Sequence, residues 1–262
     1  MVAIKKSYVD CRNGQLHVRS AGEGGVPLVC FHMSPYSGLH YGLFMAEMAK
    51  DRLVIAPDTP GYGGSDSAGD APAMADFAAA MLDMLDALGL EKVDLMGFHT
   101  GTFVALALAD MAPERVRKLV LPGIPYADVE GRQKRLAMFS GDRPYFTEDG
   151  YVQKRWDMGL KGRGAQSDDR FIALFAESMR TGVSGMNRGF AAVYRFDPDA
   201  AIDALNKPVF IPVPDEMLAD STREAAKLFK DATFQEWPDL KGDMFDIAAV
   251  DVAERVRKWL DQ

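Results

Sequence analysis

Hydrophobic residues follow two alternating patterns along this chain. Short continuous apolar runs occupy residues 27–31, 53–57 and 93–96, whereas the segment 72–88 places its apolar residues three or four positions apart. Runs that are apolar on both faces are typical of central parallel strands, and the wider spacing is typical of helices that cover a sheet. The pattern therefore predicts an α/β protein with a mostly parallel central sheet flanked by helices.

Turn and helix signals locate further elements. The dipeptide Asn13-Gly14 predicts a hairpin turn between two strands within residues 7–20. The helix expected at 72–88 would hold Pro72 in its first turn and end at Gly89. Additional strands are expected at 119–124, 208–213 and 233–237.

The alternation of strands and helices stops between residues 126 and 200. This part is richer in arginine and lysine, and it contains helical patterns such as 171–179 but no clear strand pattern. The rhythm resumes after residue 200 and closes with an amphipathic helix. We therefore predict a core formed by residues 1–125 and 201–262, with residues 126–200 inserted as a helical cap.

Amino-acid composition limits the class of protein and the kinds of partner that we expect it to bind. The chain has 262 residues, of which 48% are hydrophobic and 26% charged, and its net charge is −8. These values indicate a globular protein, and no run of lysine or arginine suggests nucleic-acid binding. No stretch is long enough to span a bilayer, residues 1–6 lack the apolar segment of a secretory signal, and two cysteines make no disulfide framework. We expect a cytoplasmic protein, monomeric or dimeric, without membrane or nucleic-acid partners.

The most informative motif follows the apolar run 93–96. Residues 97–101 read Gly-Phe-His-Thr-Gly and lead into the small-residue segment 104–109. This is the strand–turn–helix context of a nucleophile elbow, whose usual motif is Gly-x-Ser-x-Gly. The glycines permit a strained turn and a close approach of helix and strand. The side chain that such an elbow would present to a substrate is here His99.

Two more motifs complete a family resemblance. Residues 31–35, Phe-His-Met-Ser-Pro, resemble a His-Gly-x-Pro loop, and residues 56–66 resemble the turn Ala-Pro-Asp-Leu-Pro-Gly-Tyr-Gly-x-Ser-Asp. Together with the elbow and the order of elements, they make the chain similar to the α/β-hydrolase superfamily over essentially its whole length. The resemblance implies that the backbone N–H groups of Thr100 and Ser34 form an oxyanion hole, and that His32 braces loops. We expect the Asp58 carboxylate to stabilise a turn.

The departures from that family carry the functional information. His99 replaces the nucleophilic serine, and Met33 replaces the glycine of the His-Gly-x-Pro loop. Asp243 stands where the resemblance implies the catalytic histidine, and all four histidines lie in the first half of the chain. A serine mechanism needs a hydroxyl, a histidine base and a carboxylate that orients it, so an ordinary serine esterase is not expected.

The remaining groups favour acid–base chemistry. Imidazole titrates near neutral pH, so His99 could act as acid or base, oriented by a carboxylate from Asp243, Asp215 or Glu216. Such a dyad beside an oxyanion hole suits hydrolysis without an acyl-enzyme, or a lyase-type decarboxylation or C–C cleavage. Neither a Cys/His cluster nor a Gly-rich phosphate loop occurs, so we expect no metal and no cofactor.

The pocket is expected between the ends of the strands and the cap, with a carbonyl-containing, fairly apolar small molecule as the substrate. The alternative is a ligand-binding or sensor protein that kept the pocket and lost the triad. Candidate pocket residues are His32, Met33, Tyr36, His40, Phe98 and Asp128.

Overall fold

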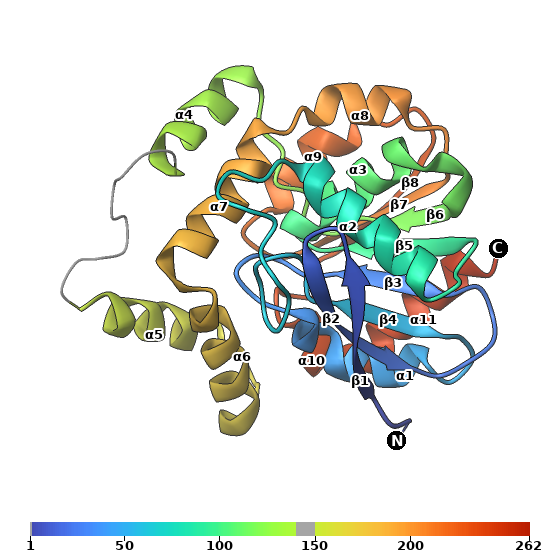
Figure 1. Ribbon diagram of the computed structural model, residues 1–262, viewed down its shortest axis with the longest axis horizontal. Coiled ribbons are helices and arrows are strands. Elements are labelled where there is room, and N and C mark those ends of the chain that lie inside the picture. The colour runs from blue at the N-terminus through green and yellow to red at the C-terminus, as the bar shows by residue number, and fades with distance from the viewer. Residues whose placement is uncertain (1, 140–149) are drawn as a thin grey trace.

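The computed structural model describes residues 2–139 and 150–262 (Figure 1). Its described strands form one sheet in the order β1-β2-β4-β3-β5-β6-β7-β8, in which β2 runs antiparallel to its neighbours and the others pair in parallel from β4 onward. The strands are β1 (Lys5–Cys11), β2 (Gly14–Ala21), β3 (Leu28–Phe31), β4 (Val54–Pro57), β5 (Val93–Gly97), β6 (Val116–Val120), β7 (Val209–Pro214) and β8 (Ala232–Trp237).

Helices cover both faces of this sheet, and several project beyond one side of it (Figure 1). They are α1 (Gly42–Met48), α2 (Met74–Ala87), α3 (Thr100–Met111), α4 (Val129–Phe139), α5 (Tyr151–Gly162), α6 (Asp168–Arg180), α7 (Gly182–Arg195), α8 (Pro198–Ala204), α9 (Ala219–Ala226), α10 (Met244–Ile247) and α11 (Ala249–Leu260). Helices α4 to α7 lie between β6 and β7 in sequence and will be called the insert. The boundary expected after residue 200 falls inside α8. Within the described residues, no helix combines the length and apolarity required to cross a membrane.

The central strands are buried on both faces, as their apolar runs predicted. In β3, Val29 and Phe31 pack in the core that includes α2 and α3, whereas Leu28 and Cys30 pack in the core that includes α1 and α11. Burial also raises the pKa of the Cys30 thiol, which makes this thiol unreactive. The sheet therefore packs between two hydrophobic cores, one on each face.

The hairpin and the first long helix differ from prediction by one or two residues. Cys11 pairs with Gly14, so the two-residue turn consists of Arg12 and Asn13 and not of Asn13-Gly14. Helix α2 begins at Met74, where the Asp76 carboxylate accepts a hydrogen bond from the Ala73 N–H at 2.8 Å. Pro72 therefore precedes the helix. This side-chain hydrogen bond sets the start of the helix, and helix propensity alone does not reveal it.

Strand β6 begins three residues earlier than the apolar pattern suggested and ends at Val120. Its second and third residues are charged, which hid them from a reading based on hydrophobicity. Arg117 donates to the buried Asp94 carboxylate at 2.8 Å, and the Lys118 ammonium lies 5.0 Å from the centre of the Trp259 ring. Both cations have partners on neighbouring elements, and this allows them to occupy a strand between β5 and β7.

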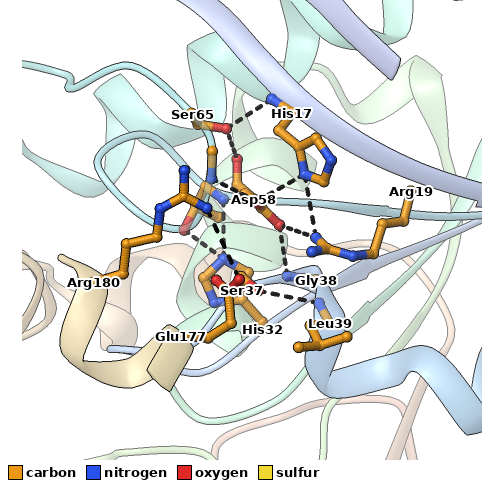
Figure 2. Close-up of polar contacts among 12 residues, drawn as sticks. His17, Arg19, His32, Ser37, Gly38, Leu39, Asp58, Ser65, Glu177 and Arg180 are labelled. Atoms are coloured by element: carbon orange, nitrogen blue, oxygen red, sulfur yellow. Dashed lines mark hydrogen bonds and ion pairs between the residues drawn. The ribbon is translucent and has the colours of Figure 1, made fainter. Parts of the chain in front are cut away.

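A buried carboxylate ties the first strands to the loop after β4 (Figure 2). Asp58 accepts hydrogen bonds from Arg19 at 2.6 Å and from the Gly38 and Gly64 N–H groups at 2.9 Å each, and it lies 2.9 Å from His17 Nδ1. Burial by itself would raise the pKa of Asp58, but Arg19 and the two N–H groups outweigh it and hold this pKa below its usual value.

We expect Asp58→Asn to destabilise the fold, because the amide would leave Arg19 without a counter-charge where both side chains are buried. Breaking one partner of a buried ion pair costs about 3–5 kcal/mol. Urea unfolding at neutral pH measures the loss. The exposed Asp231→Asn is the matched control and should leave the free energy of unfolding nearly unchanged.

Wild type and Asp58→Asn also test how the contribution of Asp58 to the free energy of unfolding depends on pH. A carboxyl group whose pKa is lowered by folding stabilises the protein above its unfolded pKa of about 3.9 and loses that contribution as pH falls through the folded value. The difference in unfolding free energy between wild type and Asp58→Asn should therefore shrink below about pH 4. A difference that stays constant to the lowest pH would contradict this role of the charge.

Candidate active site

A strained turn between β5 and α3 holds His99. Its backbone angles are φ 50° and ψ −117°, and it is the single non-glycine residue with positive φ among those described. Such a conformation costs about 1–3 kcal/mol and persists only where the surroundings enforce it. They do so here, because a Cβ on Gly97 would overlap the Gly101 backbone and a Cβ on Gly101 would overlap the Phe31 carbonyl.

The His99 ring is paired with a carboxylate from the loop after β7. His99 Nε2 lies 2.9 Å from Glu216 Oε2, and the two side chains are 15% and 4% exposed. An ionised carboxylate only accepts, so we assign the proton to Nε2, which leaves the Nδ1 lone pair available. Nδ1 makes no hydrogen bond to another described residue. Glu216 Oε1 is buried and has no hydrogen-bond partner there either.

Gly123, just after β6, provides the space for this ring. Its φ is 69°, and a Cβ placed on it would lie 2.6 Å from His99 Cδ2 and 3.1 Å from Nε2. An imidazole is much larger than the serine hydroxymethyl group expected at an elbow, so a glycine opposite it is a steric requirement. Sequence analysis missed Gly123, since the pair Pro122-Gly123 signals only a turn.

A cavity of about 480 Å³ opens beside the dyad, between the elbow and the insert. Residues expected from the sequence that line it are His99, Asp215, Glu216, Asp243, Met33, Tyr36, His40 and Phe98. The insert contributes several more, including Arg155, Lys161, Arg163 and Phe171. Distant segments therefore form one site that presents both carboxylates and cations.

Two residues expected in the pocket lie outside its lining. His32 is buried, and its Nε2 accepts from the Thr59 N–H at 3.0 Å while its Nδ1 lies 3.0 Å from the Met33 carbonyl. Burial lowers the pKa of His32, which suits a neutral ring that braces two loops. Asp128 accepts from the Gly131 N–H at 2.8 Å at the start of α4.

The oxyanion hole differs from the expectation. The Ser34 N–H donates to Thr100 Oγ1 at 3.4 Å, so this donor already has an acceptor within the protein. Thr100 is the first residue of α3, and its own N–H belongs to the helix end that lacks intrahelical acceptors. The arrangement therefore leaves one of the two expected donors, Thr100, at the positive end of the helix dipole.

The three candidate carboxylates prove to have different surroundings. The sequence left the carboxylate that orients His99 open among these three, and Glu216 is the one that bonds to His99. Asp215 is exposed, and its N–H donates to the Leu240 carbonyl at 2.7 Å. Asp243 lines the cavity without a hydrogen bond from its carboxylate to another described residue. Burial raises the pKa of Asp243.

His40 forms an aromatic wall of the cavity. Its ring stacks on Phe98 and Tyr36 with centroid distances of 5.5 and 5.8 Å, and it meets Phe245 edge-on at 5.3 Å. Burial, followed by the nearby charge of Arg170, holds the pKa of His40 well below its usual value. His40 is therefore a neutral ring in the wall, and the sequence had left its orientation open.

Arg155 is the functional candidate that the sequence did not single out. It projects from α5 into the cavity lining, and its Nε is buried without a hydrogen-bond partner. No carboxylate of the described residues forms an ion pair with it. A guanidinium left unpaired in a cavity wall is suited to bind an anionic group. Along the chain, Arg155 is only one of a cluster of basic residues in the insert, and nothing local distinguishes it from the others.

The fold and the elbow define the class of protein. A family model described as alpha/beta hydrolase fold matches residues 26–154. A hydrolase from Pseudomonas aeruginosa has a crystal structure that aligns with a TM-score of 0.82 and 18% identity, covering 98% of this chain and 99% of that one. The chain has this fold and belongs to the α/β-hydrolase superfamily.

Two hydrolases are similar to this chain in sequence. A 2-hydroxymuconate semialdehyde hydrolase from a Pseudomonas species is 34% identical over 188 residues, which are 69% of this chain and 63% of that protein. A 2-hydroxy-6-oxo-2,4-heptadienoate hydrolase from Pseudomonas putida is 37% identical over 185 residues, again 69% of this chain and 64% of that protein. Both alignments span less than two thirds of the relatives' own length.

We expect Gly123→Ala to displace the His99 ring and break its hydrogen bond to Glu216, because the new Cβ would overlap the imidazole. Proton NMR of the His99 Nε2–H, assigned with a His99→Gln sample, measures the loss of the bond. Gly89→Ala is a matched control, since Gly89 has φ 67° and a Cβ placed on it would meet nothing within 4 Å.

Both alanine variants should lose about 1–2 kcal/mol of unfolding free energy from left-handed backbone strain. Only Gly123→Ala should lose the Nε2–H signal. An unchanged signal in Gly123→Ala would show that the ring does not depend on this glycine.

Proposed function

We propose that this protein is a cofactor-free enzyme that hydrolyses a carbon–carbon bond next to the carbonyl of a small oxo-carboxylate, without an acyl-enzyme. The observation that carries the proposal is the hydrogen bond between His99 and the buried Glu216 in the lining of the cavity. It supplies a base at the position where related enzymes hold a nucleophile. The two relatives are named as hydrolases of muconate- and heptadienoate-type compounds, which supports this choice of substrate.

His99 would act as the base that activates water. Its Nδ1 accepts a proton from a water molecule while the water oxygen adds to the substrate carbonyl carbon. The buried Glu216 carboxylate stabilises the imidazolium that forms, and the Thr100 N–H faces the developing oxyanion. The bond between the former carbonyl carbon and its neighbour then breaks, which gives a carboxylic acid and leaves the electron pair on the neighbouring carbon. That carbon completes the reaction by taking a proton.

Arg155 would hold the carboxylate of the substrate. Its guanidinium has no protein counter-ion among the described residues and lines the same cavity as His99. Charge-assisted, two-pronged contacts to a carboxylate are strong and directional. The aromatic wall formed by His40, Phe98 and Tyr36 suits an unsaturated chain between the two polar ends.

We expect His99→Ala and Glu216→Gln each to lower kcat by about 10²–10⁴-fold, because a positioned base contributes that factor. The assay follows the loss of 2-hydroxy-6-oxo-2,4-heptadienoate by absorbance. Circular dichroism should show that both variants remain folded, since either new side chain fits the space of the old one.

His99→Ser provides the contrasting variant. It restores the elbow serine but should not produce an esterase, because His40, the other histidine in the cavity lining, is stacked in the aromatic wall and is not hydrogen-bonded to a carboxylate of the described residues. A wild-type rate in His99→Ala would refute the proposal and favour a ligand-binding protein on the same fold.

We expect Arg155→Met to raise KM by about 10–100-fold, because a hydrogen-bonded charge is lost from the binding site. The kcat should change less. The methyl ester of the same substrate lacks the carboxylate, so its KM should hardly respond to the substitution. Arg223→Met, an exposed arginine paired with Glu236, is the control. Equal effects on acid and ester would contradict carboxylate binding by Arg155.

A further inference from the structure

Asp243 lies at the start of α10, but its carboxyl group does not make the hydrogen bond that is usual for an aspartate there. Asp243 is the N-cap of α10, and aspartate at this position normally accepts a hydrogen bond from an N–H of the first turn. Here its side chain makes no capping bond. It lies instead in the lining of the cavity that holds His99 and Glu216.

The insert closes over this carboxyl group. Gly164, in the loop after α5, has φ 57°, and a Cβ placed on it would overlap Asp243 Oδ2. No hydrogen bond or ion pair joins the Asp243 carboxyl to another described residue. The carboxyl group is therefore half-buried, and it lines the cavity without an ion-pair partner among the described residues.

The charges around Asp243 have opposing effects. On its own segment, Asp246 disfavours the ionised form and Lys241 favours it, and the dominant influence is burial, so the pKa is raised. Asp246 is itself neutralised by Arg170 at 2.7 Å. The other charged or titratable groups that line the same cavity are Tyr36, His40, His99, Asp215, Glu216, Arg155, Lys161 and Arg163.

We propose that Asp243 is a second catalytic group of this site, a carboxylic acid that protonates the leaving carbon after the carbon–carbon bond breaks. This role rests on the proposed function and completes its last step. Glu216 already orients His99, so Asp243 is free for a different task.

The proposed step balances in atoms and charge. His99 takes one proton from water as hydroxide adds to the carbonyl carbon. When the carbon–carbon bond breaks, its electron pair stays on the leaving carbon, and the Asp243 O–H gives its proton to that carbon. The site then holds imidazolium and carboxylate, and transfer of one proton from His99 to Asp243, directly or through water, restores the starting state.

The two proton transfers can be separated by isotope exchange. Reversible addition of water needs His99 but not Asp243, and it exchanges the substrate carbonyl oxygen with ¹⁸O from labelled water. With 2-hydroxy-6-oxo-2,4-heptadienoate as the probe, Asp243→Asn should lower the cleavage rate by about 10²–10³-fold and leave the exchange rate within about threefold of wild type. Asp239→Asn, an exposed carboxylate paired with Arg255, should change neither rate.

The pH dependence gives a second readout. In the wild type, kcat should fall at high pH as Asp243 loses its proton, and this limb should be absent in Asp243→Asn. Thermal unfolding of the variant checks that its fold is intact.

Loss of cleavage and exchange by the same factor, or retention of both, in Asp243→Asn would overturn the role of Asp243. Unaltered exchange in His99→Ala, or a wild type that neither cleaves nor exchanges the probe, would instead refute the proposed function.

Discussion

The backbone contact between the elbow and β3 is the constraint on which the site depends. Gly101 approaches the Phe31 carbonyl so closely that no side chain fits, and this contact fixes the turn that carries His99. The strain in that turn, about 1–3 kcal/mol, is sustained by strands that are buried on both faces. His99 is therefore presented in one conformation, at the end of the sheet where the loops after β6 and β7 converge.

A histidine in place of the elbow serine changes the roles of the neighbouring side chains. A hydroxyl needs a separate imidazole to remove its proton, and a carboxylate then orients that imidazole. When the imidazole itself occupies the elbow, the carboxylate from the β7 loop can bond to it directly, as Glu216 does. Gly123 compensates for the larger ring. The substitution thus keeps the acid–histidine pair and removes the covalent nucleophile, and this is the physical basis of the proposed water-activating mechanism.

The cavity combines groups of opposite charge from two parts of the chain. The core contributes the carboxylates Glu216 and Asp243, and the insert contributes Arg155. A substrate that carries both a carbonyl and a carboxylate could bridge these groups across an aromatic wall. The insert is also joined to the core close to Asp243, because Arg170 on α6 bonds to Asp246 and to the Leu39 carbonyl. In the proposed mechanism, the insert therefore binds the substrate carboxylate, and the core carries the groups that react with the substrate.

The sequence by itself determined the fold and the central residue of the site. Continuous apolar runs are buried in any parallel sheet, and the glycines at 97 and 101 are required by a local turn, so both follow from short-range rules. Tertiary structure decided the rest. Which carboxylate meets His99 depends on where the loop after β7 turns, and a shift of one residue exchanges the exposed Asp215 for the buried Glu216. Likewise, Gly123 and Arg155 acquire their roles only because segments far apart in the chain meet at His99, and no local pattern encodes such a meeting.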